Sequence, residues 1–146
     1  MIVVTGAAGF IGSYFVGKLN RAGFTNLVLV DRYDDPLKER NLQSKSYSQL
    51  VDRDDFFTWF DGQRGKVEIV FHLGARTDTI GQEAESYTNL NLRYSQQMWK
   101  ACTEYRVPIV YASSAATYGN GERGFSDAHH LISQLKPLNL YAWSKH

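Results

Sequence analysis

The sequence has little cysteine, no long apolar run and almost no net charge. Its one cysteine, Cys102, excludes an internal disulfide and a zinc site built from several cysteines, and we predict no metal site. No apolar run reaches the roughly 20 residues that a membrane-spanning helix needs. The net charge of +1 gives no bias toward nucleic acid or an anionic membrane surface, so neither is expected as a partner.

A segment typical of secretion is also missing from the beginning of the chain. The apolar residues 1–4 lead directly into a glycine-rich stretch, which indicates a first strand and no signal peptide. Together with the single cysteine, this predicts a reducing compartment, the cytoplasm. The 146 residues suffice for about one domain, which buries roughly 68–70% of its unfolded surface.

The glycine-rich stretch TGAAGFIGS, at residues 5–13, joins a predicted strand to a predicted helix. Its glycines follow the spacing G-x-x-G-x-x-G. Gly6 permits a tight turn, Gly9 removes the Cβ that would block a phosphate, and Gly12 allows the helix to pack close to the strand. Free N–H groups and the positive end of the helix dipole favour a pyrophosphate at this point. The alternative is an ordinary strand–helix turn that happens to be rich in glycine.

Asp31 ends the second predicted strand and follows Gly12 by 19 residues. In a dinucleotide-binding fold, an acidic residue at this interval receives the adenosine ribose hydroxyls. The alternative is a carboxylate that caps the next loop. Asp31 favours NAD, whereas Arg32 can hold the 2′-phosphate of NADP, and the sequence leaves this choice open. Lys38 and Arg53 suit NADP too, unless they are ordinary solvated charges.

Predicted strands and helices alternate along the whole chain. We expect strands at residues 1–5, 27–30, 49–51, 67–71 and 109–112, helices at residues 10–22, 54–60 and 85–105 and after Pro137, and a loop at residues 120–134. Such alternation predicts an α/β fold, a doubly wound parallel sheet of the Rossmann type with strand order 3-2-1-4-5. One dinucleotide-binding domain, at residues 1–146, accounts for this pattern.

Apolar spacing indicates which helix faces are buried. Four residues, Ile11, Phe15, Leu19 and Ala22, are expected to face the core from the first long helix. In the helix at residues 85–105, a second apolar line offers a surface to another subunit or to another helix. Asn91 in this helix is expected either to face the cofactor or to point into solvent. His72, at a strand end, is expected to be structural.

The pattern Y-x-x-x-K places Tyr141 and Lys145 on one face of a predicted helix. A free phenol has a pKa near 10, and a neighbouring ammonium lowers the pKa of the phenol and favours the phenolate. Tyr141 can then take a proton from a substrate hydroxyl while hydride leaves the same carbon. Ser114, near the end of the last predicted strand, can hydrogen-bond that hydroxyl. On its own, Y-x-x-x-K is most often a chance pair.

The quoted stretches resemble the extended short-chain dehydrogenase/reductase superfamily, in its nucleotide-sugar epimerase and dehydratase branch. The resemblance lies in TGAAGFIGS, Asp31, HLGA (residues 72–75), YASSAATYG (residues 111–119) and YAWSK (residues 141–145). It implies a catalytic set of Ser114, Tyr141 and Lys145. From the residues and the resemblance together, the predicted cofactor contacts are Gly6, Gly9, Phe10, Ile11, Gly12, Asp31, Arg32, Lys38, Arg53, Leu73, Gly74, Ala75, Arg76, Thr77, Asn91, Tyr141 and Lys145.

Within this branch, YASSAATYG and KPLNLYAWSK (residues 136–145) look most like the bacterial epimerases of ADP-activated heptose. That likeness implies NADP as cofactor, with NAD possible, and a nucleotide-sugar substrate of lipopolysaccharide core synthesis. The implied reaction oxidises a sugar carbon, lets the carbonyl turn, and returns the hydride to the other face. Alternatives are a UDP-sugar 4-epimerase, another extended short-chain dehydrogenase, or a non-catalytic NAD(P)-binding module.

Three features depart from the family pattern. Leu73 and Arg76 stand where smaller or acidic residues are expected after the fourth strand. Ala115 and Ala116 follow Ser114, where a dehydratase needs an acidic pair, and this argues against dehydration. Family members are roughly twice as long as this chain, a size consistent with a second, substrate-binding domain. We therefore expect an incomplete dinucleotide-binding domain that is inactive alone and lacks the second catalytic base.

Overall fold

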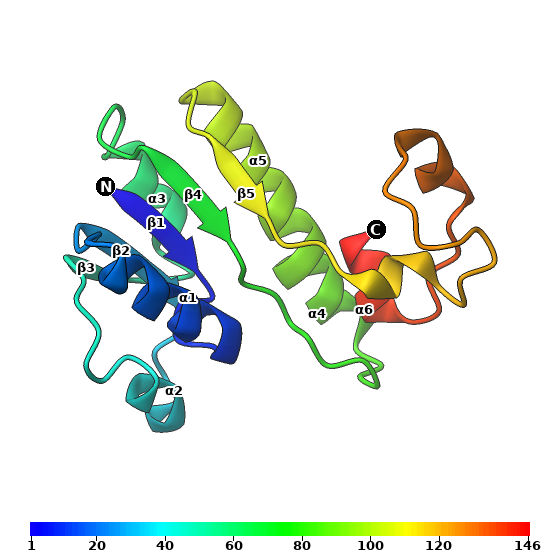
Figure 1. Cartoon of the computed structure of the whole chain (residues 1–146), viewed down its shortest axis with the longest axis horizontal. Coiled ribbons are helices and arrows are strands. Elements are labelled where there is room, and N and C mark those ends of the chain that lie inside the picture. The colour runs from blue at the N-terminus through cyan, green and yellow to red at the C-terminus, as the bar shows by residue number, and fades with distance from the viewer. The chain divides into compact units, whose positions relative to one another are not determined.

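The computed structural model describes all residues, 1–146, and they divide into two compact units. The sheet unit comprises Met1–Gly74 and Met98–Ala112, and the helical unit comprises Ala75–Gln97 and Ser113–His146. The sheet unit contains five parallel strands in the order β3-β2-β1-β4-β5, which confirms the predicted order (Figure 1). The strands are β1 (Ile2–Thr5), β2 (Leu27–Asp31), β3 (Gln49–Asp52), β4 (Ile69–His72) and β5 (Ile109–Tyr111).

The central strands form because they are almost continuously apolar, as strands covered on both faces must be. Every residue of β2, LVLVD, is buried. In β1, Val4 is opposite Leu29 on one side and Phe71 on the other. The predicted fourth strand was placed too early, at residues 67–71, because Val67 is apolar although it precedes the ladder that starts at Ile69.

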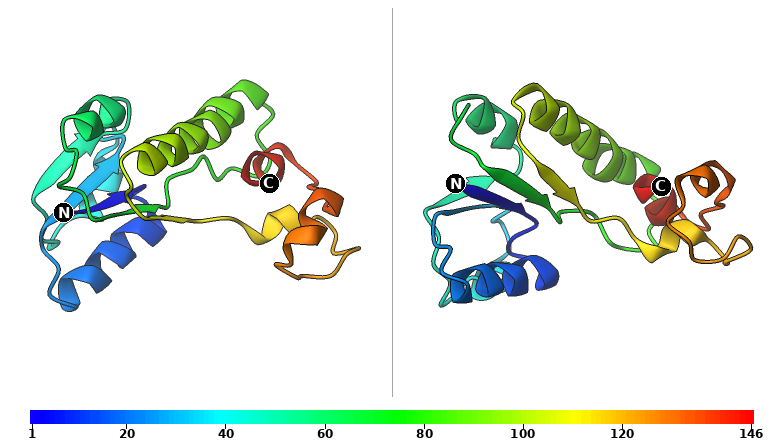
Figure 2. Two further views of the ribbon diagram at one scale, coloured as in Figure 1. Left: turned by 90° about the horizontal axis from the view of Figure 1, so that it is seen from above. Right: turned by 45° about the horizontal axis from the view of Figure 1, so that its top comes forward.

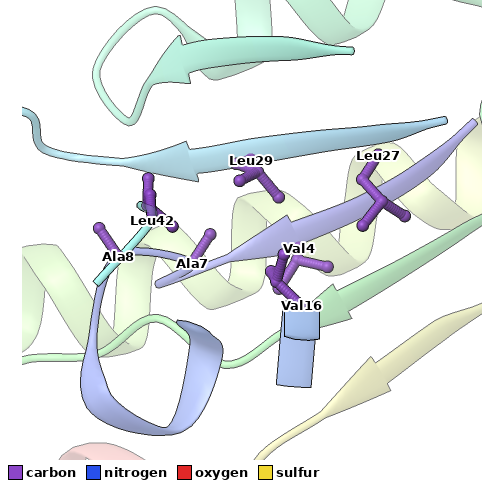
Figure 3. Close-up of a cluster of buried hydrophobic side chains, with 7 residues drawn as sticks. All are labelled: Val4, Ala7, Ala8, Val16, Leu27, Leu29 and Leu42. Carbon is purple, nitrogen blue, oxygen red and sulfur yellow. The ribbon is translucent and has the colours of Figure 1, made fainter. Parts of the chain in front are cut away.

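Helices cover both faces of the sheet (Figure 2). Helix α1 lies on one face, and α3 and α5 lie on the opposite face. On the α1 side, a buried apolar cluster joins β1, β2, α1 and the segment after α2, and its members Val4, Ala7, Ala8, Val16, Leu27, Leu29 and Leu42 are drawn in Figure 3. The helices are α1 (Phe10–Arg21), α2 (Pro36–Arg40), α3 (Phe56–Asp61) and α5 (Tyr94–Glu104), of which α5 is shared between the units.

Helix α1 confirms the predicted helix, but the predicted buried face was wrong at its start. Ile11 is 70% exposed, whereas Gly12, Ser13 and Val16 are buried. The prediction was also wrong for Ala22, which is exposed because it caps the end of the helix. Because Gly12 packs directly on the glycine turn, the buried face runs through Gly12 and Val16 and turns Ile11 outward.

The helical unit contains α4 (Ala84–Tyr87), the π-helix η1 (Thr88–Arg93), the 3-10 helices η2 (Ala115–Tyr118) and η3 (His129–Gln134), and α6 (Leu140–Lys145). The single helix predicted at residues 85–105 is therefore interrupted by a π-helical segment. The loop predicted at residues 120–134 was wrong for its last part, which is η3. Helix α6 confirms the start predicted after Pro137, and the Asn139 side chain caps it by accepting the Ala142 N–H at 2.7 Å. None of the helices combines the length and apolar content that crossing a bilayer requires.

Candidate functional site

The glycine turn between β1 and α1 has the geometry that the spacing predicted. Gly6 adopts a φ of +65°, and a Cβ on Gly6 would lie 2.7 Å from the Gly74 Cα. A Cβ on Gly12 would lie 2.0 Å from the Gly6 carbonyl oxygen. Gly6 is therefore needed for the left-handed turn and Gly12 for the close contact of helix and turn.

The beginning of α1 is open to an anion. Gly9 is its N-cap and supplies no side-chain cap, and no acidic residue lies in the first turn. Phe10 and Ile11 in that turn are 90% and 70% exposed. The first N–H groups of a helix have no partner inside the helix, and the dipole of this 12-residue helix makes its N-terminal end positive. The end of α1 can therefore accept a phosphate group without displacing a protein carboxylate.

Asp31 is buried at the end of β2 and braces the turn. One carboxylate oxygen accepts the Ala8 N–H at 2.9 Å, and the other accepts the Arg32 N–H at 2.8 Å and a hydrogen bond from the Lys38 Nζ at 3.0 Å. Each carboxylate oxygen has two lone pairs. The oxygen bonded to Ala8 retains one lone pair for a further donor such as a ribose hydroxyl.

The basic residues predicted for NADP lie in the sheet unit, and each contacts a carboxylate. Arg32 pairs with Asp34 at 2.7 Å, and Arg53 pairs with Asp54 at 3.1 Å. The Arg53 N–H also donates to the Asp31 carbonyl at 2.9 Å, which places the ends of β2 and β3 side by side. These ion pairs are exposed on at least one side, and exposed pairs are weak enough to exchange for a phosphate.

His72, the last residue of β4, belongs to a group of hydrogen-bonded residues, as expected for a structural histidine. The Nδ1 of the buried His72 lies 2.7 Å from the Thr5 Oγ1, which also accepts the Gly74 N–H at 3.0 Å. Leu73 packs against the apolar cluster of the sheet unit. These contacts hold Gly74 against the glycine turn, so both lie at the carboxyl edge of the sheet.

The remaining predicted contacts after β4 lie in the helical unit, together with Asn91. Ala75, Arg76 and Thr77 begin this unit. The Arg76 guanidinium donates to Glu83 and to the Ser86 Oγ, each at 2.7 Å. Asn91 is buried and holds the backbone of Arg76. Contact of these residues with a cofactor stays a prediction.

Helix α6 carries Tyr141 and Lys145 one turn apart, as the pattern predicted. Tyr141 is half-buried and Lys145 is buried. Burial penalises the charged ammonium and lowers the pKa of Lys145 to about 8. At pH 7 an amine with this pKa is still about nine-tenths protonated. Lys145 can therefore keep a positive charge near neutral pH while releasing a proton more readily than a solvated lysine.

An open pocket of about 510 Å³ in the helical unit brings Lys145 and Ser114 together. The Ser114 side chain caps η2 by accepting the Ala116 N–H at 3.2 Å. Tyr141 is not among the residues that line this pocket, which are Ser113, Ser114, Ala115, Thr117, Tyr118, Asp127, His129, Ile132, Lys145 and His146.

Sequence reasoning missed two other residues that line the pocket, Tyr118 and Asp127. The Tyr118 hydroxyl donates to the Asp127 carboxylate, and the Phe125 ring packs edge-on against the Tyr118 ring at 5.6 Å. The hydrogen bond to Asp127 raises the pKa of Tyr118. No periodic pattern marks Tyr118 and Asp127, because their segment is irregular and their contact spans nine residues.

A glycine turn that joins the first strand of a parallel sheet in the order β3-β2-β1-β4-β5 to a helix defines a Rossmann-type α/β fold, and the family comparison agrees with it. The chain belongs to the NAD dependent epimerase/dehydratase family, whose model matches residues 2–146.

Two curated relatives carry the same name, ADP-L-glycero-D-manno-heptose-6-epimerase. The one from Nitratidesulfovibrio vulgaris (strain DP4) is 42% identical over 147 residues, covering 99% of this chain and 46% of the relative. The one from Fusobacterium nucleatum is 38% identical over 149 residues, covering 99% and 45%. The chain thus spans about half the length of the curated relatives it matches.

Among solved structures, UDP-glucuronic acid 4-epimerase from Bacillus cereus, in complex with UDP-glucuronic acid and NAD, has a TM-score of 0.78. It is 27% identical, and the match covers 99% of this chain and 48% of that structure.

Proposed function

We propose that the protein is an NADP-dependent nucleotide-sugar epimerase that acts on ADP-glycero-manno-heptose in lipopolysaccharide core synthesis. The observation that carries this proposal is that two features occur together in this member of the family. One is a glycine turn that leads into a helix whose N-terminal end has no side-chain cap, and the other is Tyr141 one turn from a buried Lys145. The choice of sugar is supported by relatives at 38% and 42% identity that carry the heptose epimerase name. Because they are about twice as long, the activity is proposed for a protein that contains this chain.

The sheet unit has the groups needed for the adenosine diphosphate part of the cofactor. The end of α1 and the Cβ-free turn suit a pyrophosphate, and Asp31 has a lone pair for a ribose hydroxyl. We assign NADP because Lys38, which already contacts the Asp31 carboxylate, offers an ammonium to a 2′-phosphate. When bound, the cofactor supplies an acceptor that takes a hydride from a sugar carbon and returns it.

The helical unit supplies the proton chemistry. We assign Tyr141 as the base that takes the proton of the sugar hydroxyl and later returns it. We assign Lys145, one turn from Tyr141 on α6, to supply a positive charge to the catalytic set. Ser114, which lines the same pocket as Lys145, is assigned to hydrogen-bond the reacting oxygen. Because the hydride and the proton both return, the reaction consumes no cofactor.

Binding of the cofactor can be tested directly on the purified chain. We expect calorimetric titration to give saturable heat with NADP and weaker binding with NAD, and mass spectrometry to detect nicotinamide dinucleotide released on denaturation. A folded sample that binds neither dinucleotide would refute the proposal.

A UDP-sugar 4-epimerase is the second candidate function. The observation that favours it is the TM-score of 0.78 with the UDP-glucuronic acid 4-epimerase structure from Bacillus cereus. The two functions differ in the nucleotide and in the carbon that inverts. Incubating a protein that contains the whole chain with ADP-heptose or UDP-glucuronic acid, and following each by NMR, separates them. Inversion at heptose C6 supports the first assignment, and inversion at C4 of the UDP-sugar supports the second.

We further propose that the protein forms a homo-oligomer through α5. Trp99 on this helix is 55% exposed, and a contact with a second copy of the chain would bury its large apolar side chain. Light scattering should give a mass above that of one chain, and Trp99→Lys should return the mass to 16.6 kDa. A wild-type protein with the mass of one chain would contradict this assembly.

A further inference from the structure

The Arg76 guanidinium is held by residues of its own segment, although the sequence predicted Arg76 as a cofactor contact. One terminal nitrogen donates to the Glu83 carboxylate and to the Ser86 Oγ, each at 2.7 Å. The other terminal nitrogen lies 3.8 Å from the Asp78 carboxylate. The guanidinium carbon lies 4.9 Å from the centre of the Tyr87 ring, within the range of a cation–π contact. The positive charge of Arg76 is therefore shared among groups of the segment that leads into α4.

Tyr87 extends these contacts to the loop at residues 78–81. Its side chain is buried, and its hydroxyl donates to the Asp78 carbonyl at 2.5 Å. The Asp78 carboxylate accepts the Ile80 N–H at 2.9 Å and the Gly81 N–H at 3.2 Å, which folds the loop back on itself. A Cβ on Gly81 would lie only 2.5 Å from the Tyr87 hydroxyl, so the loop packs tightly on this ring. We call these linked residues the Arg76 network: Arg76, Asp78, Gly81, Glu83, Ser86 and Tyr87.

The Glu83 side chain serves Arg76 and not its own helix. Glu83 is the N-cap residue of α4, but its carboxylate caps no N–H of that helix. A single exposed ion pair contributes little, whereas a guanidinium that also donates to a hydroxyl and lies on an aromatic ring is fixed in one orientation. An ammonium lacks the planar fork for this arrangement. Arg76 therefore ties the residues that follow β4 to the beginning of α4.

We propose that Arg76 is a positioning residue, which holds the segment of Ala75 and Thr77 in its cofactor-binding conformation by tying it to α4. This inference rests on the proposed function, because that function makes the segment a contact of the nicotinamide cofactor. It differs from a direct contact, in which a cofactor phosphate would have to displace Glu83 from the guanidinium. A segment that also samples other conformations binds its ligand more weakly, in proportion to the time that it spends in them.

Neutralising Glu83 separates positioning from direct contact by the sign of the effect. A guanidinium that binds a phosphate directly would bind it more tightly once its carboxylate partner is gone, whereas a positioning guanidinium would hold the segment less well. We expect NADP to bind about three- to tenfold more weakly to Glu83→Gln in calorimetric titration of the 146-residue chain. The matched control is Glu85→Gln, the same change of charge on an exposed residue of α4, which should bind NADP as wild type does.

Two further variants test the network without removing its positive charge. Arg76→Lys keeps the charge but loses the fork, so it should also bind NADP about three- to tenfold more weakly. Gly81→Ala removes no polar group, but its Cβ would meet the ends of the Tyr87 and Asp78 side chains at 2.5 Å and 2.7 Å. These side-chain ends have to move, so the same loss of affinity is expected.

Hydrogen exchange measures the loop without any cofactor. The amides of Ile80 and Gly81 report on the Asp78 turn, because its carboxylate accepts both of them. We expect these amides to exchange about three- to tenfold faster in Glu83→Gln and Arg76→Lys, as for the loss of about one net hydrogen bond. Amides of β2 should exchange as in wild type in both variants.

Tighter binding of NADP to Glu83→Gln would overturn the inference and make Arg76 a direct contact. Wild-type affinity in Arg76→Lys would overturn it too, because the charge alone would then suffice. Unchanged exchange in the loop of both variants would show that the loop does not depend on Arg76. A wild-type chain that bound neither NADP nor NAD would refute the proposed function and this inference together, whereas a wild type that binds NADP, with the opposite sign for Glu83→Gln, refutes the inference alone.

Discussion

Asp31 accepts a hydrogen bond from the backbone of Ala8, at 2.9 Å, and so ties the end of β2 to the glycine turn. The residue predicted to read the ribose is thus also a brace for the turn that is predicted to hold the pyrophosphate. Ala8 is fully buried, and no water can replace the carboxylate as its acceptor. Stability and cofactor choice should therefore respond together when Asp31 is changed.

Asp31→Ala should lower the free energy of unfolding by about 1–3 kcal/mol, because the buried Ala8 N–H is left without an acceptor. Urea denaturation measures this change. Asp31→Asn keeps an acceptor and removes the charge that repels a 2′-phosphate, so its preference for NADP over NAD should rise about tenfold. Glu85→Gln, on an exposed carboxylate of the helical unit, is the control and should change neither quantity.

Gly12→Ala should destabilise the protein by about 1–3 kcal/mol, the range for overpacking. The new Cβ would lie 2.0 Å from the Gly6 carbonyl oxygen, and both groups belong to rigid backbone. Gly62→Ala is the matched control, since its Cβ meets only the Trp59 carbonyl at 3.4 Å. Equal midpoints of urea unfolding for the two variants would contradict the close contact at Gly12.

Thr5→Val should cost about 2 kcal/mol, because it leaves the Gly74 N–H and a nitrogen of the buried His72 without the Thr5 hydroxyl. Thr5→Ser keeps that hydroxyl and should lose only the small contribution of one methyl group, about 0.8 kcal/mol. Thermal unfolding of both variants provides the comparison. If the serine variant were the less stable of the two, the hydroxyl would not be the important group.

Lys145 should make stability rise with pH between about 8 and 10.5. Its folded pKa, about 8, lies below the ordinary 10.5, so in this window the unfolded chain binds more protons than the folded one. Below pH 8 the buried ammonium destabilises the fold, by about 1–3 kcal/mol once partial contact with water is allowed for. The difference in unfolding free energy between wild type and Lys145→Met should therefore change with pH across this window.

The Cys102 thiol acts in the opposite direction. Burial raises its pKa from 9.0 to about 11, so the unfolded chain loses this proton first and stability falls between those values. Because Lys145→Met retains Cys102, subtracting the two curves removes the thiol contribution. A difference that stayed flat from pH 8 to 10.5 would show that Lys145 is not buried.

Tyr141→Phe should abolish epimerisation, with a loss of at least about 10²-fold, the contribution of general base catalysis. NADP binding should remain, because the predicted phosphate and ribose contacts lie in the sheet unit. Calorimetry and an NMR assay of the sugar, in a protein that contains this chain, give the two measurements. Retained turnover would assign the proton transfer to another residue.

Several parts of the fold could be predicted from local sequence patterns. Continuous apolar runs indicate β1 and β2, and the glycine spacing indicates the turn and α1. The strand order followed from the alternation of strands and helices, because right-handed crossovers restrict the topologies. The pattern Y-x-x-x-K correctly placed Tyr141 and Lys145 one turn apart on one helix.

Other features depend on contacts between segments far apart in the chain. The interruption of the long helix by η1 has no periodic signal, and the hydrogen bond from Asn91 to Ser144 joins residues that are 53 positions apart. Ile11 fits the apolar stripe of α1, yet the approach of Gly12 to Gly6 turns it outward. The site assignments themselves stay predictions until a cofactor is bound.

By itself, then, the amino-acid sequence determined the five strands and their order in the sheet, the helix after the glycine turn and the types of residue available for chemistry, because these follow from periodicity and steric limits along the chain. Only the tertiary structure decided which polar atoms Asp31 and Asn91 contact and that Lys145 loses its water. Burial and hydrogen bonding depend on which distant segments pack together, and no local pattern carries that information.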